Sequence, residues 1–332
     1  MQSAHAFKRL VRNLSLTALT AVAILSVTMH SAHAQAAWPN KPIRVVVPFA
    51  PGSFTDTAAR TVGAELSAQL GQTVIVENKG GAGSTLGTDT VAKAPADGYT
   101  FLVTDNSFAV SAALYKKLPY NPKEIIQVSL LADGPAVLVA RPTLDTKTLK
   151  ETIDFARANP GKLNFGSGGQ GSSAHLAMEA FLMQNKAQLV HIPFKGDAAS
   201  IQELLAGRLD FATSIAASAA AQVKAGTVRL LAVASERRHP GFSDVPTLKE
   251  LGIDVTQLSF AGIFAPKGTP PQVLAKLDAA CAMAVKSDAV KDAAQKSNQI
   301  LAYQAMPQWD KRVHDEFQKQ GAAFRAAGGV RQ

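Results

Sequence analysis

The stretch that decides the fold is IRVVVPFAPGSFTDTAAR, residues 43–60. Its apolar, β-branched start predicts a buried strand, Gly52 permits a close turn, and Ser53 or Thr55 can cap the helix that follows. Such a junction presents unpaired N–H groups and the positive end of the helix dipole, which suits an anion, although an ordinary capped turn has the same pattern. The candidate ligand-binding residues here are Phe49, Gly52, Ser53, Phe54 and Asp56. Asp56 has a second reading, because an acid in the first turn also serves the helix dipole.

The same order of strand and helix recurs along the chain. Two capping boxes, Thr148 with Glu151 and Thr247 with Glu250, indicate helix starts, as does a proline at the first helical position within Thr269-Pro-Pro-Gln272. Units about 25 to 35 residues long, with apolar strands between the helices, predict an α/β protein with doubly wound, largely parallel sheets. The expected strands are 43–48, 73–77, 100–104, 136–140, 162–166, 189–193, 209–212, 228–234 and 260–265.

Two segments join apolar strands without a long helix, one near Gly134-Pro135 and one over 257–262. If both cross between lobes, one lobe is built from two separated pieces of chain. We therefore expect a discontinuous first lobe, 35–135 plus 259–332, and a second lobe, 136–258. This arrangement is typical of a hinged two-lobe binding protein.

The first 34 residues have the three-part layout of a secretory signal peptide. Lys8, Arg9 and Arg12 precede an apolar run over 14–27, and Ala32-His-Ala34 supplies a small-x-small cleavage site. The run is shorter than the roughly 20 residues of a membrane span, with an uncleaved anchor as the alternative. We expect cleavage after Ala34 and a periplasmic protein.

The composition excludes disorder, because 47% of the 332 residues are hydrophobic. Three of the nine excess positive charges lie in the signal segment, and the other six are scattered rather than clustered with aromatic residues. Nucleic acid is therefore not an expected partner. The single cysteine, Cys281, excludes an intrachain disulfide.

A second candidate loop covers residues 164–176, again between a strand and a helix. Gly166, Gly168 and Gly171 match the G-x-G-x-x-G dinucleotide pattern, but no acid ends a following strand about 20 residues on. The same glycines and hydroxyls suit a carboxylate held by neutral donors, without a buried salt bridge. The candidates here are Ser167, Gly168, Gln170, Ser172, Ser173 and His175, the last more typical of a packed or capping histidine than of a base.

A third loop, 191–199, adds Phe194 and Lys195, and Asp197 is expected to cap the next helix. Lys195 faces either an anionic ligand or solvent. The histidines lack metal-ligand spacing, and neither a G-x-S-x-G elbow nor an acid at fixed spacing to His175 is present. We therefore expect no enzyme, no metal site and no cofactor.

Many ordered segments together carry a resemblance to one known family. They include Pro48-Phe-Ala-Pro-Gly52, Asp97-Gly-Tyr-Thr100, Asn159-Pro-Gly-Lys-Leu-Asn164, Phe194-Lys-Gly196 and Ala265-Pro-Lys-Gly-Thr-Pro270. On these segments the chain resembles the Bug family of periplasmic solute-binding proteins, the TctC-type receptors of tripartite tricarboxylate transporters. One departure is Gly52-Ser53, where the family usually has two glycines.

The resemblance implies two α/β lobes of the type II, Venus-flytrap kind, which close on a small carboxylate-bearing solute. It also implies delivery of that solute to the membrane permease subunits of a tripartite tricarboxylate transporter; we expect the receptor itself to be a monomer. Family ligands include amino acids, di- and tricarboxylates and aromatic acids. A periplasmic ligand sensor that signals to a sensor kinase is the alternative.

Overall fold

The computed structural model describes residues 38–108, 111, 117–306, 308–315 and 318. Every named helix and strand lies in the compact unit that begins at Lys41. The expected signal peptide and its cleavage site lie outside the described residues. Within the described ranges, no helix is long and apolar enough to cross a membrane.

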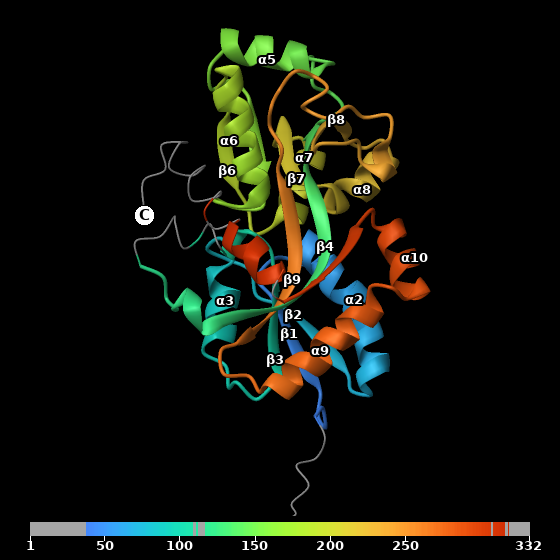
Figure 1. Cartoon of the computed structure of the whole chain (residues 1–332). Helices are drawn as coiled ribbons and strands as arrows, with labels where there is room; N and C mark the ends of the chain where they lie inside the picture. Colours follow the sequence, from blue (N-terminus) through green and yellow to red (C-terminus); the bar gives the residue numbers. More distant parts are fainter. Residues whose placement is uncertain (1–37, 109–110, 112–116, 307, 316–317, 319–332) are drawn as a thin grey trace, which may run out of the picture. The chain divides into compact units, whose positions relative to one another are not determined.

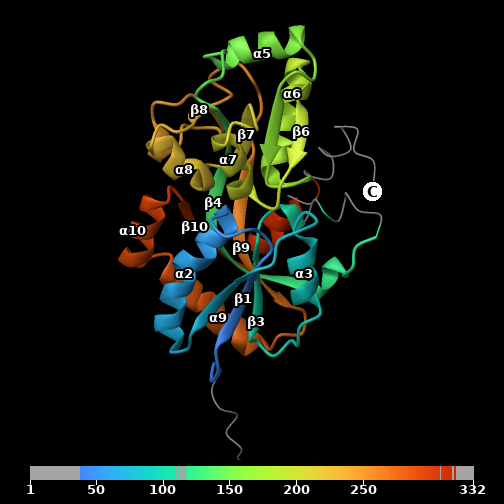
Figure 2. The same cartoon turned by 180° about the vertical axis from the view of Figure 1, so that it is seen from behind.

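The first sheet has the strand order β2-β1-β3-β9-β4, and β10 pairs with β4. Its first three strands are parallel, whereas β9 and β10 pair antiparallel to their neighbours. The strands are β1 (Ile43–Val47), β2 (Val74–Asn78), β3 (Thr100–Thr104), β4 (Ile125–Ala140), β9 (Leu258–Pro266) and β10 (Ile300–Ala305). Its helices are α2 (Phe54–Leu70), α3 (Thr85–Ala92), α9 (Pro271–Ala284) and α10 (Asp288–Lys296). Both views place α3 on one side of β1 and β3, with α2, α9 and α10 on the other (Figures 1 and 2).

The second sheet continues from the end of β4 in the order β4-β7-β5-β6, with β8 also paired to β4. β5 runs parallel to β6 and β7, while β4 is antiparallel to β7 and β8. The strands are β5 (Asn164–Ser167), β6 (Val190–Pro193), β7 (Phe211–Ile215) and β8 (Arg229–Ala234). The helices are α5 (Leu149–Ala158), α6 (Ser173–Asn185), α7 (Asp197–Leu205) and α8 (Ala216–Lys224), with short 3₁₀ turns η1 (Pro122–Glu124) and η2 (Pro240–Phe242) elsewhere in the chain.

The two sheets are joined by β4, which serves both. Residues 125–135 pair with β9 in the first sheet, and residues 136–140 pair with β7 and β8 in the second. The change of partner falls at Gly134 and Pro135, which lie opposite Ser259 and Leu258 of β9. Both segments expected to cross between lobes therefore lie side by side at this joint. The lobe boundaries themselves stay a prediction.

Each of the nine expected strands overlaps an observed strand, but several pairings differ from the expected parallel order. The first half of β4 and all of β10 were not expected, and both take part only in antiparallel pairs. Thr148 and Glu151 form the predicted capping box, and α9 begins at Pro271 as expected. Thr247 and Glu250 also form both hydrogen bonds of a capping box: the Thr247 N–H donates to the Glu250 carboxylate at 2.7 Å, and the Glu250 N–H donates to Thr247 Oγ1 at 3.0 Å. The segment after Thr247 nevertheless forms only turns.

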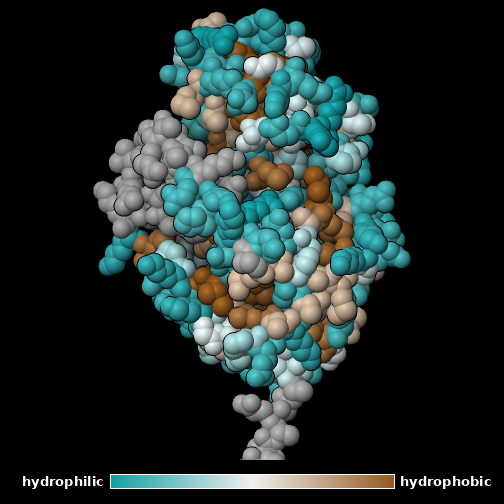
Figure 3. Space-filling view, viewed as in Figure 1, coloured by the Kyte–Doolittle hydropathy of each residue, from teal (hydrophilic) through white to brown (hydrophobic). Residues whose placement is uncertain are grey.

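Buried side chains form clusters within and between the layers. One cluster joins Phe54 of α2 to residues of the second sheet, including Phe165 and Phe211. Another cluster, which includes Phe264 and Trp309, packs on strands of the first sheet. On the face drawn in Figure 3, hydrophilic residues cover most of the surface and hydrophobic ones form patches between them. The membership of Phe54 in the first cluster places an α2 side chain directly between the two sheets.

Candidate functional site

The first loop, residues 48–56, follows β1 and is braced by Asp56. Ser53 is the N-cap of α2, as expected, and its Oγ accepts the Asp56 N–H at 3.4 Å. The Asp56 carboxylate accepts the Gly52 N–H at 2.8 Å, Asn78 Nδ2 at 2.8 Å and Arg60 Nε at 3.0 Å. Because loop, helix and strand donors already occupy this buried carboxylate, Asp56 holds the loop in shape rather than facing the cavity described below.

The second loop, residues 167–175, follows β5 and opens α6. Ser172 caps that helix, since its Oγ accepts the His175 N–H at 3.2 Å, and the Gly171 N–H donates to His175 Nδ1 at 3.1 Å. Ser173 Oγ accepts a bond of 2.9 Å from Gln257 Nε2. A Cβ at Gly168 would collide with the Asp197 side chain. The absence of a side chain at Gly168 thus permits close packing of this loop against the start of α7.

Two histidines pack behind the second loop. His191 stacks on His175 with ring centroids 4.0 Å apart, and its Nε2 lies 2.8 Å from Ser167 Oγ. Burial, with the neighbouring His175, lowers the pKa of His191 to about 3, so its ring is neutral at physiological pH. His175 Nε2 lies 3.5 Å from Glu179, and this hydrogen bond lowers the pKa of the Glu179 carboxyl. Because Ser167 is fully buried, a substrate cannot reach the serine–histidine pair without a rearrangement.

The third loop, residues 193–197, connects the second sheet to the first loop through its main chain. The Lys195 carbonyl accepts the Ala50 N–H at 3.1 Å, while the Lys195 side chain is exposed. The Gly196 N–H donates to the Gly168 carbonyl at 3.0 Å. The prediction that Asp197 caps α7 is wrong. Gly196 is the N-cap, and Asp197 is the first helical residue, with its carboxylate accepting the Ile215 N–H at 2.8 Å.

A small cavity of about 10 Å³ lies where these loops meet. Residues from the N-termini of α2, α6 and α7 and from the end of β7, immediately before α8, line it, so the starts of four helices meet at one cavity. Its lining residues are Phe49, Ser53, Phe54, Thr55, Asp105, Ser172, Ser173, Ala174, Asp197 and Ile215. A volume of this size holds about one water molecule. A larger solute therefore requires the loops to separate, which breaks the bond between Ala50 and Lys195.

Two buried carboxyl groups, Asp105 and Asp197, line this cavity. Burial raises the pKa of Asp105 to about 6, although the Ser107 N–H, at 2.8 Å, favours the ionised form. Burial raises the pKa of Asp197 to about 7; the Ile215 N–H opposes this effect and the charge of Asp105 adds to it. No ion pair to either group occurs among the residues that the structure describes. Between about pH 6 and 7 the protonated and the ionised forms are therefore both populated.

Five of the residues expected from the sequence meet at the cavity, namely Phe49, Ser53, Phe54, Ser172 and Ser173. Eight others lie outside its lining: Gly52, Asp56, Ser167, Gly168, Gln170, His175, Phe194 and Lys195. Sequence reasoning missed Asp105, Ala174 and Ile215, and it gave Thr55 and Asp197 only a capping role. The position of Asp105 and Ile215 in the sequence could have identified them, because both stand at the carboxyl ends of parallel strands, where α/β sheets bind ligands.

The donor groups around the cavity suit an organic solute rather than a metal. No group of three histidine, cysteine or acidic side chains with metal-binding geometry occurs within the described ranges. The serine and threonine hydroxyls and the helix N-termini favour negative charge on a ligand. Each aspartate, when protonated, favours a ligand that accepts a hydrogen bond, and when ionised favours a ligand that carries positive charge.

Most of the chain matches a known protein family. The sequence model described as "Tripartite tricarboxylate transporter family receptor" matches residues 58–328. Protein BugT of Bordetella pertussis is 35% identical over 297 residues, which are 88% of this chain and 90% of BugT.

Solved structures with the same fold are also similar in sequence. The periplasmic binding protein BugD superposes with a TM-score of 0.85 at 30% identity, covering 89% of this chain and 100% of BugD. MatC from Rhodopseudomonas palustris, solved with bound malate, superposes with a TM-score of 0.80 at 30% identity, covering 86% of this chain and 99% of MatC. These neighbours are periplasmic binding proteins with a two-lobe fold.

Proposed function

Because the chain belongs to the TctC (Bug) family of tripartite tricarboxylate transporter receptors, whose members are extracytoplasmic solute-binding proteins, we propose that it binds a small carboxylate-bearing solute between its first and second loops. The solute is delivered to the membrane permease subunits of a tripartite tricarboxylate transporter. Export through the signal peptide, with cleavage after Ala34, brings the receptor to the periplasm.

The observation that carries this proposal is the convergence of helix N-termini on one cavity. Ser53 is the N-cap of α2 and Ser172 is the N-cap of α6, and both residues line the same cavity. Each N-terminus supplies partial positive charge and N–H donors, and together they stabilise an anion without a buried cation. The malate bound to the relative MatC is a carboxylate of this class.

The two buried aspartates give this binding a pH dependence. An ionised Asp105 or Asp197 repels a carboxylate, whereas a protonated one donates a hydrogen bond to it. Since the pKa values of these groups are raised to about 6 and about 7, a fall in pH from 8 to 6 converts much of the pair to the binding form. We therefore expect tighter carboxylate binding at the lower pH.

Closure couples binding to recognition by the permease. When the loops separate, the Ala50–Lys195 hydrogen bond is lost, and a bound solute that contacts both loops restores the closed form. A ligand shifts this equilibrium only by its differential affinity for the closed state. Presentation of the closed form to the permease makes delivery depend on occupancy.

Calorimetric titration of the purified protein with malate, citrate, glutamate and nicotinate tests the proposal, with the corresponding amides as uncharged controls. Ser172→Ala removes a hydroxyl that lines the cavity, and Ser243→Ala changes an exposed serine elsewhere. We expect at least one carboxylate to bind, its amide to bind far more weakly, and only Ser172→Ala to reduce affinity, by about fivefold or more. If no carboxylate binds, the proposed ligand class is wrong.

A further inference from the structure

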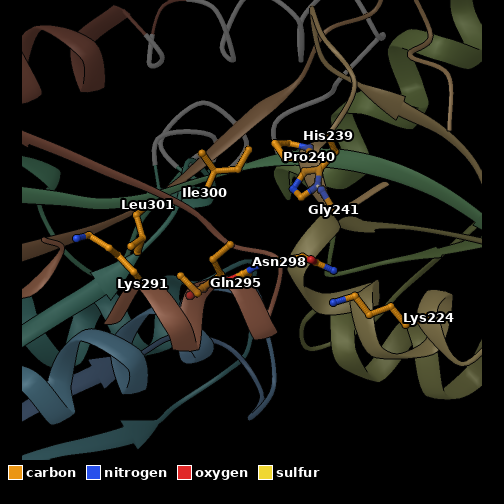
Figure 4. Close-up of a pocket in the computed structure, with 11 residues that line it drawn as sticks. Lys224, His239, Pro240, Gly241, Lys291, Gln295, Asn298, Ile300 and Leu301 are labelled. Atoms are coloured by element: carbon orange, nitrogen blue, oxygen red, sulfur yellow. The ribbon is translucent and has the colours of Figure 1, made fainter. Parts of the chain in front are cut away.

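A second cavity, of about 530 Å³, lies away from the loops described above. It is bounded by the end of α8 and by η2, which belong with the second sheet, and by α10 and the start of β10, which belong with the first (Figure 4). We call it the joint cavity; the residues used below are Lys224, His239, Asn298 and Gln299. Its volume lies within the range of small-molecule sites.

Three buried polar atoms around the joint cavity have no hydrogen-bond partner. They are His239 Nε2, Asn298 Nδ2 and Gln299 Oε1, and their residues are only 4%, 7% and 8% exposed. Buried polar atoms are nearly always paired, so three unpaired ones at a single cavity indicate a missing partner. These atoms come from two different segments of the chain, and the cavity is where those segments meet.

The hydrogen bonds around these atoms assign their roles. Gln299 Nε2 donates to the Phe54 carbonyl at 3.3 Å, so its Oε1 is the group left as an acceptor. His239 Nδ1 accepts the Gly241 N–H at 3.0 Å, so in the neutral ring Nε2 carries the hydrogen and is a donor. That hydrogen faces the Asn298 carbonyl without reaching hydrogen-bond geometry. Burial lowers the pKa of His239 by more than the Asn298 carbonyl raises it, so the pKa is lowered overall. The groups left for a ligand are thus the Asn298 amide, a neutral donor, and the acceptor Gln299 Oε1.

The charged groups at the joint cavity are cationic. Lys224 forms no hydrogen bond or ion pair with any residue that the structure describes, and its side chain points toward that of Asn298 (Figure 4). Lys291, also at the cavity, forms an exposed pair with Asp288 at 3.1 Å and points away from this group (Figure 4). No aspartate or glutamate is among the described lining residues. An unpaired cation beside a neutral donor selects an anion with oxygen acceptors.

We propose that the joint cavity binds a small oxyanion, a carboxylate or a phosphate, between Lys224 and the unpaired amide donor of Asn298. Gln299 Oε1 accepts a hydrogen bond from a hydroxyl of the anion or of a water bound with it. This site is separate from the cavity between the loops, because the two share no lining residue. Since its walls come from elements of both sheets, a bound anion also stabilises the arrangement of the two sheets described above.

Titration of the purified protein with inorganic phosphate and, separately, with acetate tests the inference, at constant ionic strength set with chloride. Two variants remove the expected contacts, Lys224→Gln by deleting the cation and Asn298→Asp by replacing the amide donor with a carboxylate. Asparagine and aspartate both tolerate the left-handed backbone at this position, where φ is 51°. Lys150→Gln on α5 is the matched control, because it removes the same charge from an 85% exposed side chain.

We expect saturable binding of one phosphate or acetate per chain, weakened at least tenfold by Lys224→Gln and by Asn298→Asp and unchanged by Lys150→Gln. The phosphate and acetate arms then identify the preferred oxyanion. Binding should persist in Ser172→Ala, because that side chain lines the cavity between the loops and caps α6 but does not line the joint cavity. Absence of saturable binding by both anions would overturn the inference, as would equal weakening by Lys224→Gln and Lys150→Gln. Comparison with Ser172→Ala separates these results from carboxylate binding between the loops.

Discussion

Replacement of Asp105 by asparagine should stabilise the protein increasingly as the pH rises. The folded protein holds the Asp105 proton more tightly than the unfolded chain, because burial raises its pKa from 3.8 to about 6. The unfolded chain therefore binds fewer protons between these values, and stability falls as the pH increases through them. Each pKa unit corresponds to about 1.4 kcal/mol. A difference of about two units therefore lowers the unfolding free energy by about 3 kcal/mol above pH 7 and by less than about 1 kcal/mol at pH 4. Asparagine has the same shape and still accepts the Ser107 N–H, but carries no charge.

Urea unfolding of the wild type and of Asp105→Asn at pH 4, 6 and 8 measures this difference. We expect the variant to gain about 3 kcal/mol over the wild type at pH 8 and little at pH 4, and loss of the charge beside Asp197 acts in the same direction. Asp288→Asn serves as the control, since that side chain is 96% exposed and should give one small difference at all three pH values. An Asp105→Asn effect that does not grow with pH would refute the reasoning.

Four further outcomes follow from the same contacts. Asp56→Ala leaves the Gly52 N–H, Asn78 and Arg60 without their acceptor and should lower the unfolding free energy by about 2 to 4 kcal/mol in urea; a loss below about 0.5 would contradict its bracing role. Phe54→Ala should cost about 3 to 5 kcal/mol in the same measurement, since the ring is 2% exposed between the sheets, and a milder loss would mean that the site collapses to fill the space. Thr148→Ala should cost about 1 kcal/mol by removing the capping box of α5, without altering carboxylate affinity. Carboxylate affinity should rise about tenfold from pH 8 to pH 6 as Asp197 takes up its proton, and calorimetry of Asp197→Asn should show a weaker pH dependence.

Local sequence signals predicted the elements well because each depends on neighbours in the chain. The apolar run before Gly52 forms β1, Ser53 caps α2, and Thr148 with Glu151 forms a complete capping box. The same logic failed where the partner is distant. Thr247 and Glu250 form the bonds of a capping box, yet no α-helix follows them. The strand β10 has no strong pattern of its own and is completed by antiparallel pairing with β4.

The candidate site was only partly accessible from the sequence for the same reason. Loops at strand ends identified Ser53, Ser172 and their neighbours, because a strand followed by a capped helix is a local pattern. His175 was a reasonable candidate by position, but its ring is held by Gly171 and stacked on His191, a residue 16 positions away. Asp105 carried no motif, and its importance comes from burial beside Asp197.

The sequence by itself determined the α/β class, the strand–loop–helix junctions and the family, because these rest on local pattern and on ordered segments along one chain. Tertiary structure alone decided which loop side chains face a common cavity, how β4 serves two sheets, and which buried groups lack a partner. The physical reason is that desolvation and hydrogen-bond pairing depend on what surrounds a side chain in space. Asp56 and Asp197 illustrate this difference: both are buried aspartates in the first turn of a helix, but Asp56 is bonded to Arg60 whereas Asp197 has no ion pair among the described residues.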